Sequence, residues 1–231
     1  VAVLRAIMKV LGIETMVYSD GALREGVMYD MLGRFASEDV RDRSVLALIK
    51  RYSGVKKQAK QVVKTSLNLF EQVKAKLALN SEDGDLLRRA ASLHEIGLAI
   101  AHSSYHKHSA YLIEYSDIPG FSQVDQKRMA QLMLNHRRKL KADMLEQTCT
   151  IGGDSLVYLC LLLRLAVLAH HSRSDHELPE LELKVIDDNR WQITVGESSE
   201  YYAFLLSDLH TEVEQFAKWG VKLSVIEAEC G

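Results

Sequence analysis

The sequence contains few cysteines, prolines and aromatic residues, and each shortage argues against a class of protein. Among its 231 residues are three cysteines, two prolines and 7% aromatic residues. The number of cysteines is odd and their spacing is not that of metal ligands, which argues against a disulfide framework. They are Cys149, Cys160 and Cys230. The low proline and aromatic content favours a helical fold over a β-sandwich or barrel. A content of 47% hydrophobic and 26% charged residues is that of an ordinary soluble globular protein.

Charge of one sign and long apolar runs are also lacking. The formal net charge of −2 argues against a surface that attracts nucleic acid as a whole. A local basic patch is compatible with this net charge. The longest apolar run, SLVYLCLLLRLAVLA, is interrupted by Arg164 and is shorter than the roughly 20 residues that span a bilayer. No signal peptide pattern opens the chain. We therefore expect a cytoplasmic protein, and peripheral attachment to a membrane stays open.

The first 32 residues predict a helix, a short strand at about Thr15 to Tyr18, a turn and a second helix. No strand pattern follows for well over 100 residues, and an isolated strand is unstable. We therefore expect the chain to be part of a longer protein whose sheet lies upstream.

From Ser37 to His171 the apolar residues recur at helical spacing. Ser122 followed three residues later by Asp125 is a variant of the capping box. Gly97 is expected to end or bend its helix. The last helix of this region is apolar nearly all round, so we expect it at the centre of a bundle. The expected helices cover residues 37–53, 55–79, 81–101, 104–116, 122–141 and 153–173.

The pattern changes after about Ser174. Two alternating runs in LELKVIDDNRWQITV, joined at residues 187–189, predict a β-hairpin. An amphipathic helix that ends at Gly220 and a closing strand, VKLSVIEAE, follow. We therefore predict a mainly α fold, in which a helical bundle precedes a small β-β-α-β (α+β) domain.

Four of the nine histidines lie in AASLHEIGLAIAHSSYHKHSAYLI, which raises the question of a metal site. His94-Glu95 lacks the second histidine that a zinc-protease helix carries one turn later, because position 98 is leucine. His102 and His106 have the spacing of one helical turn, but Ser103 and Ser104 are expected to break the helix between them. These spacings do not favour a bound transition metal.

The order of motifs resembles that of the HD-domain phosphohydrolases. LLRRAASLHEIGL is similar to their His-Asp helix end, YHKHSAYLIEYSDIPGFS to the next histidine-bearing helix, and LLLRLAVLAHHSR to the helix with their last aspartate. Three ligand positions differ, because the resemblance places Thr65 or a neighbour, Glu95 and Val167 there. The resemblance therefore implies a degenerate HD-like bundle that has kept the fold and lost the metal. A working HD hydrolase with a bound metal is the alternative.

A closer resemblance covers essentially the whole chain. The chain resembles the bacterial exopolyphosphatase and guanosine pentaphosphate phosphohydrolase family in three segments. They are YSDGALREGVMYDMLGRFASEDVRDRS, the His-Glu segment and DDNRWQITV. The N-terminal half of that family is similar to actin-like and sugar-kinase-like ATPases and carries Mg²⁺ and the catalytic carboxylates. The resemblance implies that residues 1–34 are the last strand and helix of that catalytic domain, 35–174 the HD-like domain and 175–231 the small α/β domain. It implies no catalytic residue and no metal ligand in this chain.

The activity implied first is exopolyphosphatase, which hydrolyses the terminal phosphate of inorganic polyphosphate and releases orthophosphate. This region would guide the polyphosphate chain and support a homodimer, and we expect it to be inactive alone. One alternative is the guanosine pentaphosphate (pppGpp) phosphohydrolase of the same family. Another is a non-catalytic module that binds an alarmone, (p)ppGpp, or polyphosphate and mediates dimerisation.

Phosphate ligands need spaced cations, and arginine suits them best because its planar fork pairs with two oxygens. Each candidate also has an ordinary structural role, such as a salt bridge, a capped helix end or a packed histidine. The candidate phosphate-binding residues are Arg24, Arg41, Arg43, His94, His106, His108, Arg137, Arg138 and Lys139.

Overall fold

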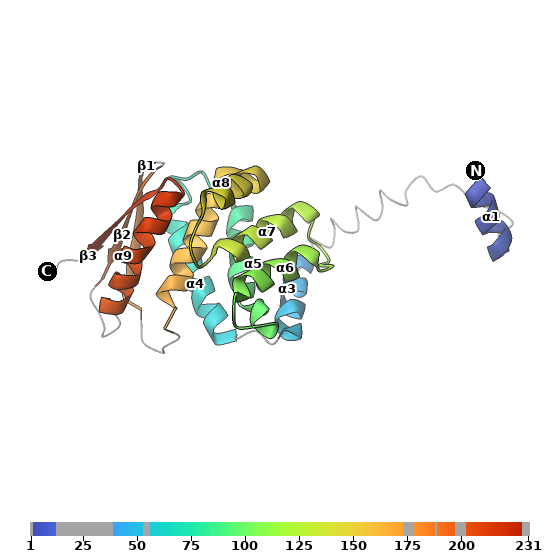
Figure 1. Cartoon of the computed structure of the whole chain (residues 1–231), viewed down its shortest axis with the longest axis horizontal. Helices are drawn as coiled ribbons and strands as arrows, with labels where there is room; N and C mark the ends of the chain where they lie inside the picture. Colours follow the sequence, from blue (N-terminus) through green and yellow to red (C-terminus); the bar gives the residue numbers. More distant parts are fainter. Residues whose placement is uncertain are drawn as a thin grey trace. The chain divides into compact units, whose positions relative to one another are not determined.

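The computed structural model describes residues 2–12, 39–52, 56–172, 178–187, 189–196 and 202–227 (Figure 1). The chain divides into two units, residues 1–40 and 41–231. In the first unit the structure describes one amphipathic helix, α1 (Ala2–Leu11). The strand expected at about Thr15 to Tyr18 and the candidate residue Arg24 lie outside the described residues.

The second unit contains a helical bundle and a small sheet, which confirms the predicted mainly α fold with a small β-containing domain. The helices of the bundle are α3 (Val40–Arg51), α4 (Lys56–Val73), α5 (Ser81–Leu93), the 3₁₀ helix η1 (Ile96–Ala99), α6 (Tyr105–Tyr115), α7 (Gln123–Asn135) and α8 (Ala142–Ala169). Two of them begin with a capping box. Ser122 caps α7 with Asp125, as predicted, and Asn80 caps α5 with Asp83.

Helix α8 is the core of the bundle, and it consists of two helical parts that meet in a kink at Gly153, whose angles of φ +64° and ψ −165° are not helical. The second part begins after Gly153, where the sequence predicted a helix start, and the part before Gly153 was not predicted. By length and composition α8 could cross a membrane, but 56% of its most apolar window is buried inside the protein. Its leucines pack against α4, α5 and α7, as expected of a central core helix.

The helix that Gly97 was predicted to end or bend, α5, has already ended at Leu93. Gly97 lies in η1, where a Cβ atom would stand 2.2 Å from the carbonyl oxygen of Tyr105. Its backbone N–H donates to Ser109 Oγ, which in turn donates to the carbonyl of His94. The glycine therefore permits close approach of α6 to the end of α5, which brings their histidines together.

The small domain has the predicted β-β-α-β order. Strands β1 (Leu181–Asp187) and β2 (Arg190–Val195) are antiparallel, and β3 (Lys222–Glu227) pairs with β2 in parallel. Helix α9 (Tyr202–Lys218) packs against β3 and against α8, and α4 contacts β1. Trp191 and Phe216 are fully buried between the sheet and the helices. These contacts join the sheet to the bundle, so the ends of α7 and α8 lie near α9.

Candidate functional site

Three histidines from three helices meet in the bundle. His94 follows α5, His106 lies on α6 and His136 follows α7, and all three are buried. The ring centroids of His94 and His136 are 5.6 Å apart, and those of His106 and His136 are 6.3 Å apart. Tyr105 stacks near His136 at 5.7 Å. The structure thus gathers two of the predicted histidines, His94 and His106, around His136.

Burial and neighbouring cations oppose the protonation of His106 and His136. Burial, followed by the charges of Arg137, Lys107 and Arg138, lowers the pKa of His106 to about 4. Burial also lowers the pKa of His136 well below its usual range. His136 Nδ1 lies 2.6 Å from the carbonyl oxygen of Met133, which can only accept, so Nδ1 carries the proton and donates it. His136 Nε2 is then a buried acceptor, and it has no hydrogen-bond partner among the described residues.

Two arginines follow directly on this cluster. The Arg137 guanidinium lies over the Tyr105 ring at 4.4 Å, a cation–π contact that fixes its plane. Arg138 has φ +69°, a left-handed conformation that costs a non-glycine residue roughly 1–2 kcal/mol. Arg164 supports this turn from α8, because it donates to the carbonyls of Asn135 and Arg138. The turn therefore has a fixed, strained shape that projects two adjacent cations.

A cavity of about 200 Å³ lies beside this turn. Ligand sites for small molecules measure about 300–1,000 Å³, so this cavity suits a phosphate group better than a whole nucleotide. It is lined by Tyr105, His136, Arg137, Arg138, Arg164, Val167, Leu168, His171, Asp208, Thr211 and Glu212.

The charges of the cavity favour an anion. Arg164 forms a buried ion pair with Glu212, which neutralises both groups. Asp208 lies 3.8 Å from the exposed His171. Among the described residues, Arg137 and Arg138 have no carboxylate partner, so their charges are available to a ligand. Arginine pairs of this kind bind phosphate oxygens through charge-assisted hydrogen bonds.

The other candidates lie outside this cavity lining. Arg41 and Arg43 lie on α3, where Arg43 is exposed and Arg41 has a partner. Asp42 between them bonds Arg88 and Arg89 at 2.8–2.9 Å. Burial raises the pKa of Asp42, but these two arginines outweigh it and lower the pKa overall. The charges of α3 are therefore paired in the way that is typical of a structural contact between helices.

His108 is half-buried on α6, and Lys139 is exposed after Arg138. The cavity lining includes neither of them. Their assignment to phosphate, like that of Arg41 and Arg43, stays a prediction.

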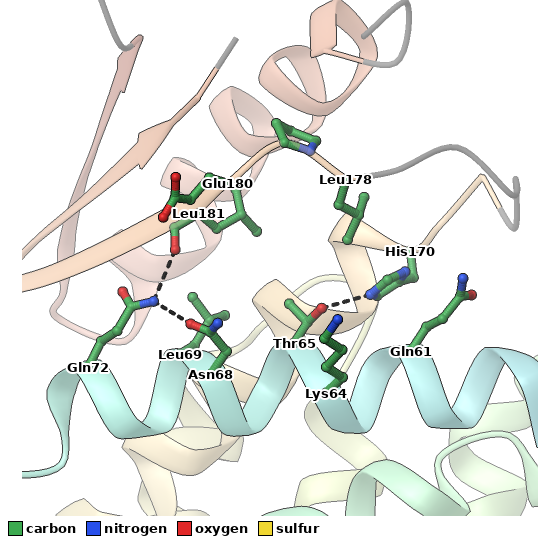
Figure 2. A pocket seen from close by; sticks show the side chains of 11 residues that line it. Gln61, Lys64, Thr65, Asn68, Leu69, Gln72, His170, Leu178, Glu180 and Leu181 are labelled. Atoms are coloured by element: carbon green, nitrogen blue, oxygen red, sulfur yellow. Dashed lines mark hydrogen bonds between the residues drawn. The ribbon is translucent and has the colours of Figure 1, made fainter. Parts of the chain in front are cut away.

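The positions that resemble altered HD ligands do not all line one cavity. Val167 lies in the wall of the 200 Å³ cavity. Thr65 lines a different cavity, where its hydroxyl lies 2.8 Å from His170 Nε2 (Figure 2). In the part of the chain that the structure describes, no three His, Cys, Asp or Glu residues are arranged to hold a metal ion.

Sequence reasoning missed Arg164, Tyr105 and His171 as members of the site. A signal for Arg164 was present, because one arginine inside an all-apolar helix requires a buried partner. No local signal marks Tyr105, since its role depends on the stacking of Arg137 on its ring.

The fold and this cavity define a mainly helical protein with a small α/β unit and a candidate anion site. The family described as Ppx/GppA phosphatase, domain III, matches residues 40–213. The chain belongs to the Ppx/GppA phosphatase family, which confirms the family predicted from the sequence.

Three relatives of the chain carry the same name. It is 37% identical over 227 residues to the "Guanosine-5'-triphosphate,3'-diphosphate pyrophosphatase" of Pseudoalteromonas translucida (strain TAC 125), a match that covers 97% of the chain and 45% of the relative. The proteins of the same name from Aeromonas hydrophila subsp. hydrophila and Aeromonas salmonicida are 36% and 34% identical over 230 residues. Each of these matches covers 98% of the chain and 46% of the relative. The chain thus spans slightly less than half the length of these relatives.

The pKa of His106 tests the electrostatics of the site. Replacing Arg137 and Arg138 with alanine removes two of the charges that oppose protonation, so the pKa of His106 should rise from about 4 toward its ordinary value of 6.5. Histidine chemical shifts followed by NMR from pH 3 to 8 measure this change. The exposed Arg43 on α3 offers a matched control, because Arg43→Ala should leave the titration unchanged. An unshifted His106 in the double variant would show that these arginines do not act on it.

The lowered pKa of His106 also predicts how the stability of the fold depends on pH. The folded state disfavours protonated His106, so below pH 6.5 the unfolded chain binds more protons than the folded chain. The contribution of His106 to stability is therefore present above about pH 6.5 and is lost as the pH falls toward about 4.

Proposed function

We propose that this chain forms the C-terminal region of a guanosine pentaphosphate phosphohydrolase and binds phosphate groups of that substrate beside Arg137 and Arg138. The observation that carries the proposal is the 34–37% identity over 97–98% of the chain to proteins named guanosine-5'-triphosphate,3'-diphosphate pyrophosphatase. These names favour the alternative of the sequence analysis over exopolyphosphatase, which the resemblance put first.

In the intact enzyme, water attacks the terminal 5'-phosphoryl group of pppGpp. The phosphoanhydride bond breaks, and orthophosphate and guanosine tetraphosphate leave. Mg²⁺ would offset the charge of the phosphates, and we assign it to the N-terminal half because the family resemblance places it there. The role of this chain is to hold phosphate oxygens. Arg137 and Arg138 would donate to them, with the Arg138 backbone fixed by Arg164.

Polyphosphate offers the same phosphate oxygens, so the experiment must separate the two substrates. The C-terminal region of the Pseudoalteromonas translucida relative is replaced by this chain, and orthophosphate release is measured from pppGpp and from long-chain polyphosphate. We expect the chimera to hydrolyse pppGpp at least tenfold faster than the relative truncated before the exchanged region. Faster release from polyphosphate would instead support the exopolyphosphatase assignment, and a chimera no better than the truncated relative would contradict both.

Variants of the chimera test the phosphate site. Arg137→Ala with Arg138→Ala removes charge-assisted hydrogen bonds of roughly 1.5–3 kcal/mol each, so KM for pppGpp should rise tenfold or more. Arg43→Ala is the matched control, because Arg43 is exposed on α3 outside the cavity lining. The chain alone should release no orthophosphate. Turnover by the chain alone would contradict the placement of the catalytic groups upstream.

The homodimer, the cytoplasmic location and the membrane association stay predictions. Gel filtration with light scattering tests the first, and cell fractionation tests the other two.

A further inference from the structure

The side chains that line the cavity beside Arg137 and Arg138 come in two groups of opposite hydrogen-bonding character. The two guanidinium groups only donate, because a guanidinium has no acceptor. Helix α9 contributes Asp208, Thr211 and Glu212, which share one face of the helix because they are three and four residues apart. The cavity therefore places cationic donors and oxygen acceptors around the same space.

The acceptors of α9 differ in what they offer to a ligand. Glu212 is buried and bound to Arg164, which neutralises it. The Thr211 hydroxyl donates to a backbone carbonyl of its own helix at 3.2 Å, so its oxygen can only accept from a ligand. Asp208 lies 3.8 Å from His171, which is longer than a hydrogen bond. Since its side chain is 41% exposed, the Asp208 carboxylate is accessible to a ligand in the cavity.

A carboxylate in an arginine-lined anion site restricts which anion fits. Two ionised oxygens that approach each other repel, unless one of them carries a proton and donates it to the other. Sulfate carries no proton near neutral pH, and neither do the interior phosphates of polyphosphate. Orthophosphate keeps one proton as HPO₄²⁻. The lining therefore suits an anion that accepts from the arginines and also donates to a carboxylate.

We propose that this cavity binds orthophosphate, whose ionised oxygens accept from Arg137 and Arg138 and whose hydroxyl donates to Asp208. Orthophosphate is a product of the hydrolysis proposed above. A bound product therefore opposes the binding of a substrate phosphate at the same arginines. The inference rests on the proposed function for this competition, and the binding of orthophosphate itself follows from the lining of the cavity.

The test titrates the 231-residue chain with orthophosphate and with sulfate at pH 8 and equal ionic strength, followed by calorimetry. At this pH both anions are tetrahedral and mainly doubly charged, and they differ by one proton. We expect orthophosphate to bind at least tenfold more tightly, because sulfate makes no hydrogen bond to the carboxylate and is repelled by it. Equal binding of the two anions, or no binding of orthophosphate, would overturn the inference.

Substitutions of single carboxylates on α9 assign the selectivity to Asp208. Asp208→Asn should raise the affinity for sulfate at least tenfold and bring the two affinities together, because an amide can donate to sulfate and accept from orthophosphate. A general loss of structure would weaken both anions instead. Glu214→Gln is the matched control, since Glu214 is exposed on the same helix outside the cavity lining. Unchanged selectivity in Asp208→Asn, or lost selectivity in Glu214→Gln, would contradict the assignment.

The chimera tests the competition, with the formation of guanosine tetraphosphate followed by chromatography. Added orthophosphate should raise KM for pppGpp more than the same concentration of sulfate does, and kcat should stay unchanged. This difference between the anions should disappear in Asp208→Asn and persist in Glu214→Gln. If orthophosphate inhibits Asp208→Asn as selectively as it inhibits the unmodified chimera, the product binds elsewhere and the proposed competition is wrong.

The failure of this inference is distinguishable from the failure of the proposed function. If the chimera hydrolyses pppGpp but the chain does not distinguish orthophosphate from sulfate, the orthophosphate site is wrong and the proposed function stands. If the chain selects orthophosphate through Asp208 while the chimera acts only on polyphosphate, the proposed function is wrong and the orthophosphate site stands.

Discussion

Replacing Arg164 with leucine should lower the free energy of unfolding by about 3–5 kcal/mol, the cost of leaving one partner of a buried ion pair uncompensated. Arg164 and Glu212 are only 4% and 5% exposed. Without the guanidinium, the Glu212 carboxylate must lose its charge or remain buried alone. The carbonyls of Asn135 and Arg138 also lose a donor. Urea unfolding followed by circular dichroism measures the change.

Two controls distinguish the effect of the buried Arg164–Glu212 ion pair from the effect of removing any surface charge. Lys74→Leu removes one partner of an exposed pair, whose side chains are 44% and 61% exposed, and should cost less than about 1 kcal/mol. Arg164→Leu combined with Glu212→Leu should recover much of the lost stability, since no buried charge then remains. A double variant as unstable as the single one would show that the carbonyl contacts, not the ion pair, carry the effect.

The same substitution should weaken phosphate binding. Arg164 is a positioning residue, because it holds the left-handed Arg138 and not the ligand itself. In the chimera, Arg164→Leu should raise KM for pppGpp at a temperature where the variant is folded. The double variant with Glu212→Leu should not restore KM, since the Arg138 carbonyl stays without its donor. This pattern separates positioning of the turn from overall stability.

Much of the fold was predictable because its signals are local. The apolar spacing located the helices, the Ser122 and Asp125 pair marked the start of α7, and the alternation around residues 187–189 marked the hairpin. The pattern also marked the break at Gly153, where the angles of α8 are not helical. It missed the part of α8 that begins at Ala142, because that part carries more polar residues than the apolar run after Gly153.

The candidate site was predictable only in part. Arg137 and Arg138 stand out in the sequence as adjacent cations at a helix end. Arg164 depends on a partner 48 residues away, and the hydrogen bond of Thr65 depends on a histidine 105 residues away. Such pairings follow from tertiary packing, which one sequence without its fold does not display. The cavity lined by Thr65 and His170 was missed for the same reason, because its opposite wall comes from the segment that enters β1.

Replacing Gly97 with alanine should destabilise the bundle by about 3 kcal/mol or more, at the upper end of the cost of overpacking. The added Cβ would lie 2.2 Å from the Tyr105 carbonyl oxygen and 2.5 Å from the Ser109 nitrogen. Both are backbone atoms, so no side-chain rotation relieves the clash. The α6 helix must move away from η1, and Tyr105 and His106 move with it. Urea unfolding gives the cost, and the NMR shifts of His106 and His136 report the displacement.

Gly220→Ala is the matched control for backbone strain. Gly220 has φ +79° and no atom within 4 Å of a Cβ, so its replacement tests the left-handed conformation without a clash. That strain should cost roughly 1–2 kcal/mol and leave the histidine shifts unchanged. A loss of stability in Gly97→Ala no larger than in Gly220→Ala would contradict the close approach of α6. A larger loss with displaced histidine shifts would show that Gly97 sets the geometry of the histidine cluster, and with it the position of the Tyr105 ring beneath Arg137.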